Sequence, residues 1–208
     1  MLDGLARRLV DPALDRMGRA LAARGVAADA LTFAGLVCGL AAALAIALAA
    51  DGLALAALAL NRLLDGLDGA VARARERTDR GGFLDIVFDF TSYGAVPLAF
   101  AVRDPPANAL AAAVLLFAFY VNGASFLAFA ALAAKRGLET SVRGVKSIYF
   151  TVGLAEGTET ILAFAAMILW PAYFPLIAAA FAGLTLMGAV ARVTLAWHVF
   201  SGDTDDKD

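Results

Sequence analysis

The chain has 208 residues, of which 62% are hydrophobic and 17% charged, with a formal net charge of −2 at pH 7. Soluble globular domains are nearer half apolar and a quarter charged, so this composition predicts a protein with several membrane-spanning segments. The single cysteine excludes an intrachain disulfide and a thiolate metal site. No basic arm with interleaved aromatic residues is present, and no nucleic-acid partner is expected.

Residues 1–28 form the first predicted element, a helix that lies in the headgroup layer of a membrane. Apolar residues recur at about helical spacing from Leu2 to Leu21, and arginines occupy many of the positions between them. This pattern is typical of an interfacial amphipathic helix. We expect the pair Asp11-Pro12 to interrupt the helix, because the residue before a proline disfavours helical geometry.

Six hydrophobic stretches follow within residues 30–200, each at least as long as the roughly 20 residues that cross a bilayer. The predicted spans are 31–50, 53–75, 83–102, 107–134, 147–170 and 173–199. The acidic tail, 201–208, is short and expected to be disordered. We therefore expect one all-α integral membrane domain over residues 1–208, with six transmembrane helices preceded by the interfacial helix.

The distribution of lysine and arginine predicts the orientation of these spans. Basic residues gather before the first span, in the 73–80 connection and in the 135–146 loop, whereas the turns near Asp51 and Pro171 have none. Because cytoplasmic loops carry an excess of such residues, both termini and the 73–80 connection are expected to be cytoplasmic.

Four aspartates lie at the cytoplasmic ends of the second and third spans. Asp65 and Asp68 are three residues apart and share a helix face, and Asp85 and Asp89, four apart, share a face of the next helix. The short connection allows the two helices to pack antiparallel with the carboxylates together. Ionisable groups at membrane depth usually mark function. A pair of hard divalent cations, which prefer oxygen ligands, would relieve the repulsion.

Two cations held by carboxylates suit phosphoryl-transfer chemistry, because they neutralise the oxygens of a diphosphate and stabilise a leaving group. A further carboxylate can accept the proton of an attacking hydroxyl. The small residues Gly69, Ala72 and Gly81 leave room beside the ions, and Arg73 can contact a phosphate. The alternative is a structural cluster whose carboxylates cap helices or pair with Arg62, Arg73 or Arg75.

The pattern Asp-x-x-Asp-Gly-x-x-Ala-Arg, a spacer, then Gly-x-x-x-Asp-x-x-x-Asp resembles the signature of the CDP-alcohol phosphotransferases, also called CDP-alcohol phosphatidyltransferases. The matching positions are Asp65, Asp68, Gly69, Ala72, Arg73, Gly81, Asp85 and Asp89. The spacer, 74–80, is one residue shorter than usual, so either Gly81 or Gly82 fills the second glycine position. In finer detail the chain resembles a bacterial inner-membrane subgroup.

The resemblance implies that Asp65, Asp68 and Asp85 hold two Mg²⁺ or Mn²⁺ ions. Asp89 would complete the cluster and act as the catalytic general base. The residues implied to bind the CDP-linked substrate are Gly69, Ala72, Arg73 and Gly81. The reaction implied is transfer of a phosphatidyl group from CDP-diacylglycerol to a small polar alcohol or alcohol phosphate, with release of CMP. A variant moves a CDP-linked headgroup to a lipid alcohol. A homodimer in the bacterial inner membrane, with a cytoplasmic active site, is also implied.

Three polar residues outside the motif are candidates for binding the acceptor: Lys146 at the start of the fifth span, and Glu156 and Glu159 within it. Lys146 could instead be an interfacial anchor. The glutamates could flank a helix break or pair with Arg192 of the last span. Acids in broken spans also occur in cation- or proton-coupled transporters, the competing class. The four motif aspartates lie at one end of their helices, which favours the enzyme.

Overall fold

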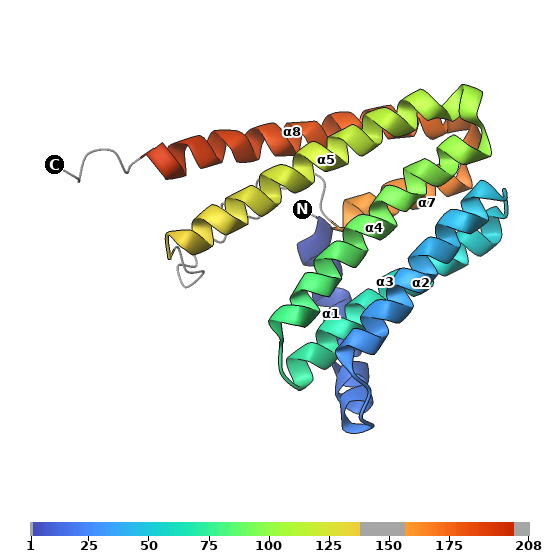
Figure 1. Ribbon diagram of the computed structural model, residues 1–208. Coiled ribbons are helices and arrows are strands. Elements are labelled where there is room, and N and C mark those ends of the chain that lie inside the picture. Colours follow the sequence, from blue (N-terminus) through green and yellow to red (C-terminus); the bar gives the residue numbers. More distant parts are fainter. Residues whose placement is uncertain (1, 138–156, 202–208) are drawn as a thin grey trace.

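The computed structural model describes residues 2–137 and 157–201, with side chains from residue 10 onwards, and these residues form helices and no strand. The helices are α1 (Leu2–Ala23), α2 (Ala28–Ala47), α3 (Asp51–Ala74), α4 (Asp79–Arg103), α5 (Pro105–Lys135), α7 (Gly157–Leu169), the 3₁₀ turn η1 (Pro171–Tyr173) and α8 (Phe174–Phe200). The predicted all-α class is therefore confirmed for the described residues (Figure 1).

The expected interruption at Asp11-Pro12 is wrong, because α1 continues through Pro12 to Ala23. The contacts of α1 with α3 that follow the proline explain this. A Cβ added to Gly18 would lie 2.5 Å from Ala70 Cβ, and one added to Gly66 would lie 2.7 Å from Leu14 Cδ1. Packing this close outweighs the backbone hydrogen bond that a proline removes.

Helix α2 packs on both α3 and α4, whereas α3 and α4 make few direct contacts with each other. Small residues allow the close approach: a Cβ added to Gly39 would lie 2.5 Å from Ser92 Oγ. Asn61 of α3 donates a hydrogen bond from Nδ2 to the Gly35 carbonyl at 2.8 Å. The expectation that α3 and α4 pack directly against one another is thus wrong, since α2 holds them apart.

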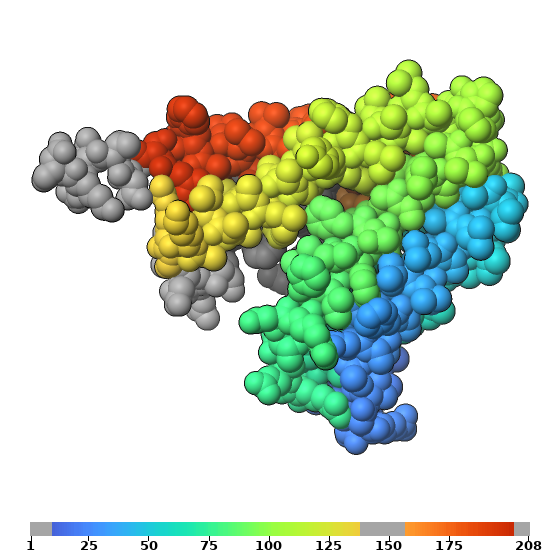
Figure 2. Space-filling view, viewed as in Figure 1, coloured from blue at the N-terminus to red at the C-terminus, as the bar shows by residue number. Residues whose placement is uncertain are grey.

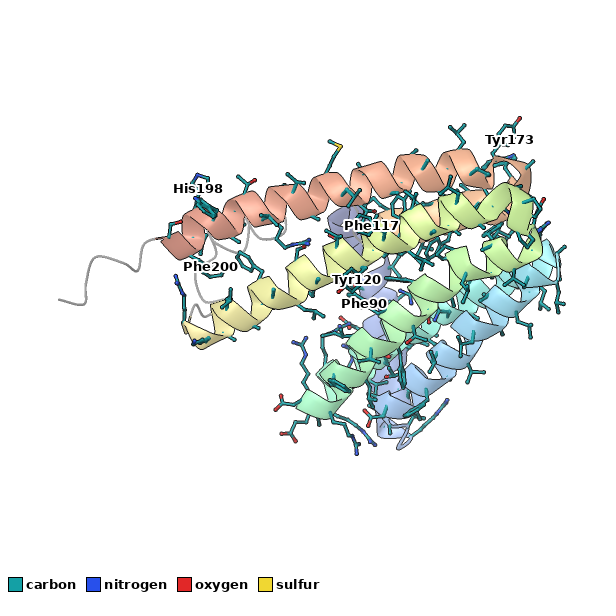
Figure 3. All side chains as sticks on the ribbon, turned by 45° about the horizontal axis from the view of Figure 1, so that its top comes forward. Phe90, Phe117, Tyr120, Tyr173, His198 and Phe200 are labelled. Carbon is teal, nitrogen blue, oxygen red and sulfur yellow. The ribbon has the colours of Figure 1, made fainter. Side chains whose placement is uncertain are left out.

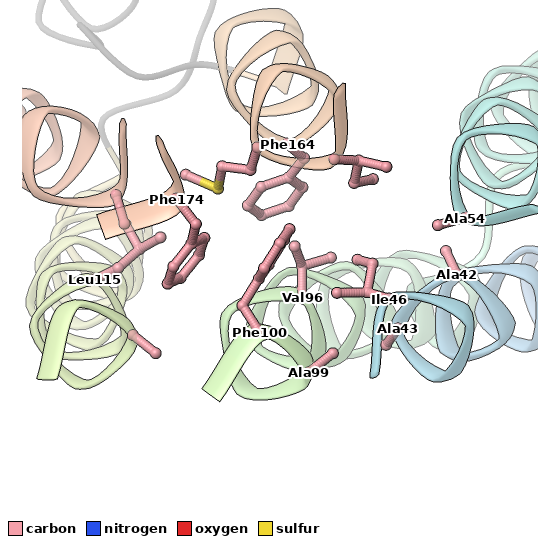
Figure 4. Packing of buried hydrophobic residues seen from close by; sticks show 14 of the residues in the cluster. Ala42, Ala43, Ile46, Ala54, Val96, Ala99, Phe100, Leu115, Phe164 and Phe174 are labelled. Carbon is pink, nitrogen blue, oxygen red and sulfur yellow. The ribbon is translucent and has the colours of Figure 1, made fainter. Parts of the chain in front are cut away.

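The hydrophobic core lies at the start of α3 and the end of α4, and it includes residues of α5, α7 and α8 (Figure 4). The rings of Phe100 and Phe174 stack with centroids 4.3 Å apart. Phe164 of α7 meets Tyr93 edge-on, with centroids 6.0 Å apart. Phe100, Phe164 and Phe174 are completely buried. This core fixes the far ends of the helices that carry the aspartates.

Helices α5 and α8 lie side by side and extend beyond the rest of the bundle (Figure 1). In the space-filling view the yellow end of α5 diverges from the green start of α4 (Figure 2). Helix α5 stays against α4 past its middle, as far as Gly123, where Phe90 fills the space that the glycine leaves. Arg192 of α8 donates to Asn122 Oδ1 at 3.0 Å and to Ser125 Oγ at 2.7 Å on α5.

Four helical stretches are long and apolar enough to cross a membrane: Ala28–Ala47, Asp79–Arg103, Pro105–Lys135 and Pro171–Phe200. They match four of the six predicted spans. The second predicted span corresponds to α3, whose charged residues are spread along the helix. The first half of the fifth predicted span lies outside the described residues. Large apolar side chains are exposed along these helices, as a lipid-facing surface requires. Figure 3 shows His198 near the end of α8 and Tyr173, the last residue of η1, at the opposite end of that helix.

Candidate active site

The candidate site is a pocket between α3 and α4 with α2 as its floor. It encloses about 220 Å³, part of which is open to solvent. Its lining residues are Thr32, Gly35, Leu36, Asn61, Arg62, Asp65, Asp68, Asp85, Phe88, Asp89 and Ser92. All four predicted aspartates therefore face one cavity, which exists because α2 separates the two helices that carry them.

The turn between α3 and α4 places the two pairs of aspartates at the same end. Thr78 is the N-cap of α4, and its Oγ1 accepts a hydrogen bond from the Gly81 N–H at 3.1 Å. This contact satisfies one of the amide groups that every helix start leaves unpaired. Asp85 and Asp89 then occupy the second and third turns of α4, opposite the end of α3.

Three of the carboxylates form a compact group. One oxygen from each of Asp65, Asp68 and Asp85 lies within 4.8 Å of the other two. Asp68 is buried, and its Oδ2 has no hydrogen-bond partner within the described parts of the chain. Oxygens this close need only small side-chain rotations to reach one hard cation, whose bonds to oxygen are about 2.1–2.4 Å long. A buried carboxylate oxygen without a partner is costly unless a cation satisfies it. These residues therefore fit a divalent metal ion.

Asp89 lies apart from this group and pairs with an arginine of α3. Arg62 Nη2 donates to Asp89 Oδ1 at 2.8 Å, and Arg62 Nη1 lies 3.5 Å from Asp65 Oδ2. The alternative of a structural cluster paired with arginines thus applies to Asp89 and in part to Asp65. It does not account for Asp68, which belongs to the three-carboxylate group and has a buried oxygen without a hydrogen-bond partner in the described structure.

Sequence reasoning missed the polar residues that hold Arg62 in the pocket. Arg62 donates from Nη1 to Tyr93 Oη at 3.0 Å and from Nε to Asn61 Oδ1 at 2.9 Å. Helical spacing could have found them, because Tyr93 is four residues after Asp89 and Asn61 four before Asp65. An arginine within an apolar helix is itself a signal of function.

The predicted substrate-binding residues lie beyond the pocket lining, toward the start of α4 and the end of α3. Arg73 Nη2 pairs with Asp15 Oδ1 of α1 at 2.8 Å. A Cβ added to Gly69 would lie 3.3 Å from Arg73 Nη1, so this glycine leaves room for the guanidinium. Ala72 is partly buried on the same helix. Arg73 is about 40% exposed, which leaves it accessible to a ligand at this end.

The two candidate glycines at the start of α4 differ in their surroundings. A Cβ added to Gly81 would lie 3.1 Å from Thr78 Oγ1 and 3.4 Å from Asp29 Oδ1. A Cβ added to Gly82 would meet no atom within 4 Å. Gly81 is therefore the position where a side chain is constrained, which favours it as the second glycine of the motif.

The predicted acceptor residues lie mostly beyond the described ranges. Lys146 and Glu156 fall in the segment that the structure does not describe, and Glu159 lies in the first turn of α7. A Cβ added to Gly157 would lie 4.0 Å from Tyr93 Oη, so the start of α7 approaches the pocket side of α4. Arg192, the predicted alternative partner of the glutamates, places its guanidinium against Asn122 and Ser125 of α5.

Sequence comparisons agree with the motif. The model of the CDP-alcohol phosphatidyltransferase family matches residues 25–200. The chain is 48% identical over 196 residues to the inner membrane protein YnjF of Escherichia coli, covering 93% of this chain and 94% of that protein. It is 34% identical over 103 residues to an archaetidylinositol phosphate synthase of Pyrococcus horikoshii, covering 49% of this chain and 54% of that protein.

The fold also resembles that of a solved enzyme, the Mycobacterium tuberculosis phosphatidylinositol phosphate synthase PgsA1. With CDP-DAG bound, that structure gives a TM-score of 0.69 at 23% identity, covering 94% of this chain and 98% of that one. Its apo form gives 0.60 at 24% identity, covering 88% and 95%. At this identity the likeness shows a shared fold. The family match and the E. coli relative confirm the resemblance seen in the motif: the chain is an enzyme that belongs to the CDP-alcohol phosphatidyltransferase family.

Proposed function

We propose that this enzyme transfers a phosphatidyl group from CDP-diacylglycerol to a small polar alcohol or alcohol phosphate and releases CMP, with two divalent ions, Mg²⁺ or Mn²⁺. The single observation that carries the proposal is the three-carboxylate group of Asp65, Asp68 and Asp85, whose oxygens lie within 4.8 Å in an open pocket. The similar PgsA1 structure was determined with CDP-DAG bound, which supports the donor.

In this proposal Asp65, Asp68 and Asp85 hold the metal, which supplies neutralisation of the diphosphate oxygens and of the departing CMP. Arg73 lies two turns beyond Asp65 and adds a positive charge for a donor phosphate. Gly69, Ala72 and Gly81 keep side chains out of the path between Arg73 and the pocket. These residues bind and orient the donor so that its phosphorus faces the carboxylate end of α4.

Asp89 is the proposed general base. It lines the pocket, and its side chain is 31% exposed, so an acceptor hydroxyl can reach it. The acceptor oxygen forms a bond to the phosphorus of the phosphatidyl group while the bond to the CMP oxygen breaks. The hydroxyl proton passes to Asp89. The negative charge of the leaving group remains on CMP.

We also propose that residues 1–208 form a single membrane domain with six spans. Four of these spans are the long apolar helices named above, and α3 and α7 belong to the other two. Arg75 donates to the Ala22 carbonyl at 3.0 Å and Arg80 pairs with Asp29 at 2.6 Å, so the basic connection lies beside the end of α1 and the start of α2. The positive-inside rule then supports a cytoplasmic site and cytoplasmic termini in a bacterial inner membrane. A homodimer is part of the same proposal.

Two other functions compete with this one. The reverse transfer within the class, from a CDP-linked headgroup to a lipid alcohol, would use the same carboxylates. A cation- or proton-coupled transporter would need acids near the bilayer midplane. Here the aspartates lie within the last three turns of α3 and the first three turns of α4, beside the basic connection. This position at one end favours the transferase.

The test is CMP release by the purified protein in detergent, with CDP-diacylglycerol, Mg²⁺ or Mn²⁺, and a panel of acceptors: glycerol 3-phosphate, inositol phosphate, serine and choline. We expect metal-dependent CMP release with one acceptor. Asp89→Asn should lower kcat about 10²-fold or more, as loss of a general base does. The control is Asp79→Asn, an exposed acid of α4 outside the pocket. Full activity of a folded Asp89→Asn protein would remove Asp89 as the base.

A further inference from the structure

Arg62 occupies a position between the two groups of carboxylates. Its Nη2 contacts Asp89 Oδ1 at 2.8 Å, and its Nη1 lies 3.5 Å from Asp65 Oδ2. The signature that this chain matches does not include this arginine. Its guanidinium supplies Asp89 with a positive charge at contact distance, which is what a metal ion at that carboxylate would otherwise supply.

Contacts from α3 and α4 hold the Arg62 side chain in place. Tyr93 of α4 accepts a hydrogen bond from Nη1 at 3.0 Å, and its ring centroid lies 5.3 Å from Arg62 Cζ. Asn61 accepts from Nε at 2.9 Å and itself donates to the Gly35 carbonyl of α2. The side chain is 18% exposed. Two hydrogen bonds and a cation–π contact thus hold the guanidinium of Arg62 beside Asp89, and displacing it would break them.

This arrangement divides the four carboxylates unequally. Asp65, Asp68 and Asp85 bring oxygens within 4.8 Å of one another and include the unpartnered Asp68 Oδ2. Asp89 instead has its charge compensated by Arg62. A second divalent ion that used Asp89 and Asp65 would need the oxygens that Arg62 contacts. It would also be repelled by the guanidinium at short range.

We propose that Arg62 is a positioning residue that holds Asp89 and competes with a second divalent ion for that carboxylate. The protein binds one ion tightly through Asp65, Asp68 and Asp85. The second ion of the proposed reaction binds much more weakly, because it must displace the guanidinium from Asp89. This inference rests on the proposed function in one respect, namely that the carboxylates bind divalent metal.

The experiment measures binding of Mn²⁺ alone to the full chain in detergent micelles, without substrate, from the paramagnetic resonance signal of the free ion. For the native protein we expect one tight site and a second at least about tenfold weaker. Arg62→Gln should raise the affinity of the second site about tenfold or more and change the first by less than about threefold. The matched control is Arg80→Gln, which removes an exposed arginine at the same end of the bundle.

A second variant keeps the test decisive where Arg62→Gln fails to fold. Tyr93→Phe retains Arg62, the four carboxylates and the aromatic ring, and removes one hydrogen bond to the guanidinium. It should raise the second-site affinity in the same direction by about two- to fivefold. Unchanged second-site binding in both folded variants, or in Tyr93→Phe alone where Arg62→Gln is unfolded, would overturn the proposal.

The remaining outcomes also separate the two proposals. Two equally tight sites in the native protein would overturn the role of Arg62 and leave the proposed transferase intact. No Mn²⁺ binding in the native protein would overturn both the metal part of the proposed function and this inference. A purely structural role for Arg62 would lower the melting temperature of its variants without changing the second-site affinity.

Discussion

The two ends of the α2–α3–α4 bundle are held together by different means. At one end Phe100, Phe164 and Phe174 are completely buried, and the rings of Phe100 and Phe174 stack. At the other end Asp65, Asp68 and Asp85 crowd together, with an oxygen of Asp68 buried and unpartnered in the described structure. The first end is held by packed aromatic rings, whereas the second gathers like charges whose repulsion a cation would relieve.

The polar layer between the ends explains how one set of helices supports both. Asn61 and Ser92 are buried, and Asn61 is bonded to the backbone of α2. Tyr93 contacts Phe164 on the core side and Arg62 on the pocket side. The hydrophobic end therefore fixes the spacing of α3 and α4 that the carboxylate end, with its like charges, would not maintain by itself.

The largest effect is expected at the carboxylate end, where a substitution should abolish activity while the protein stays folded. Asp85→Asn should lower kcat by about 10³-fold or more, because it removes one of the three clustered carboxylates. The melting temperature of the ion-free protein should stay the same or rise, since a like charge is removed from the cluster. Metal-dependent CMP release and a thermal melt in chelator measure the two effects. An Asp85→Asn protein that melts earlier in chelator would show that this carboxylate stabilises the bundle by itself.

At the aromatic end we expect a substitution to lower stability and to leave metal binding unchanged. Phe100→Ala should lower the free energy of unfolding by about 3–5 kcal/mol, because it leaves a cavity beside Phe174. The affinity for Mn²⁺ should be unchanged in the fraction that remains folded. Leu98→Ala is the matched control, since Leu98 lies on the same helix with 56% of its surface exposed. An equal loss of stability in both variants would contradict the special role of the packed end.

Removal and return of the metal should change stability through the carboxylate end. An ion at one hundred times its Kd stabilises the state that binds it by about 2.7 kcal/mol. Mn²⁺ added after chelation should therefore raise the melting temperature of the native protein. The same addition should have much less effect on Asp68→Asn, which neutralises the buried carboxylate. Equal shifts in both proteins would place the bound ion elsewhere.

The smallest expected effect concerns the Asp15–Arg73 pair, which joins α1 to α3 on the exposed side of the site. An ion pair this exposed contributes less than about 1 kcal/mol. Asp15→Asn and Arg73→Gln should therefore each lower the free energy of unfolding by the same small amount. If Arg73 binds the donor, only Arg73→Gln raises the KM for CDP-diacylglycerol, by about tenfold. The same KM in both variants would remove Arg73 from the donor site.

The bounds of the helices could be predicted well because hydrophobic length and turn residues determine them locally. The predicted span 107–134 and α5, for example, differ by one or two residues at each end. The convergence of the four aspartates on one pocket also followed from helical spacing. The separation of α3 from α4 by α2 did not, because it depends on Gly35 and Gly39 meeting residues far along the chain.

The partition of the aspartates was likewise hidden in the sequence. Asp85 and Asp89 share a helix face, yet one joins the three-carboxylate group and the other contacts Arg62. The difference comes from Arg62, which contacts Asp89. Tyr93 and Asn61 hold Arg62 in place from two different helices. Spacing within one helix identifies which residues share a face, but contacts between helices decide which partner each carboxylate obtains.

The unpartnered Asp68 oxygen also bears on the fate of the protein in a cell. A buried polar atom left unsatisfied destabilises a fold by about 1–3 kcal/mol, and such a difference changes steady-state abundance several-fold through quality-control proteolysis. Copies that acquire their metal would outlast those that do not. Cellular supply of the ion would then determine how many enzyme molecules a membrane retains, as well as the turnover of each.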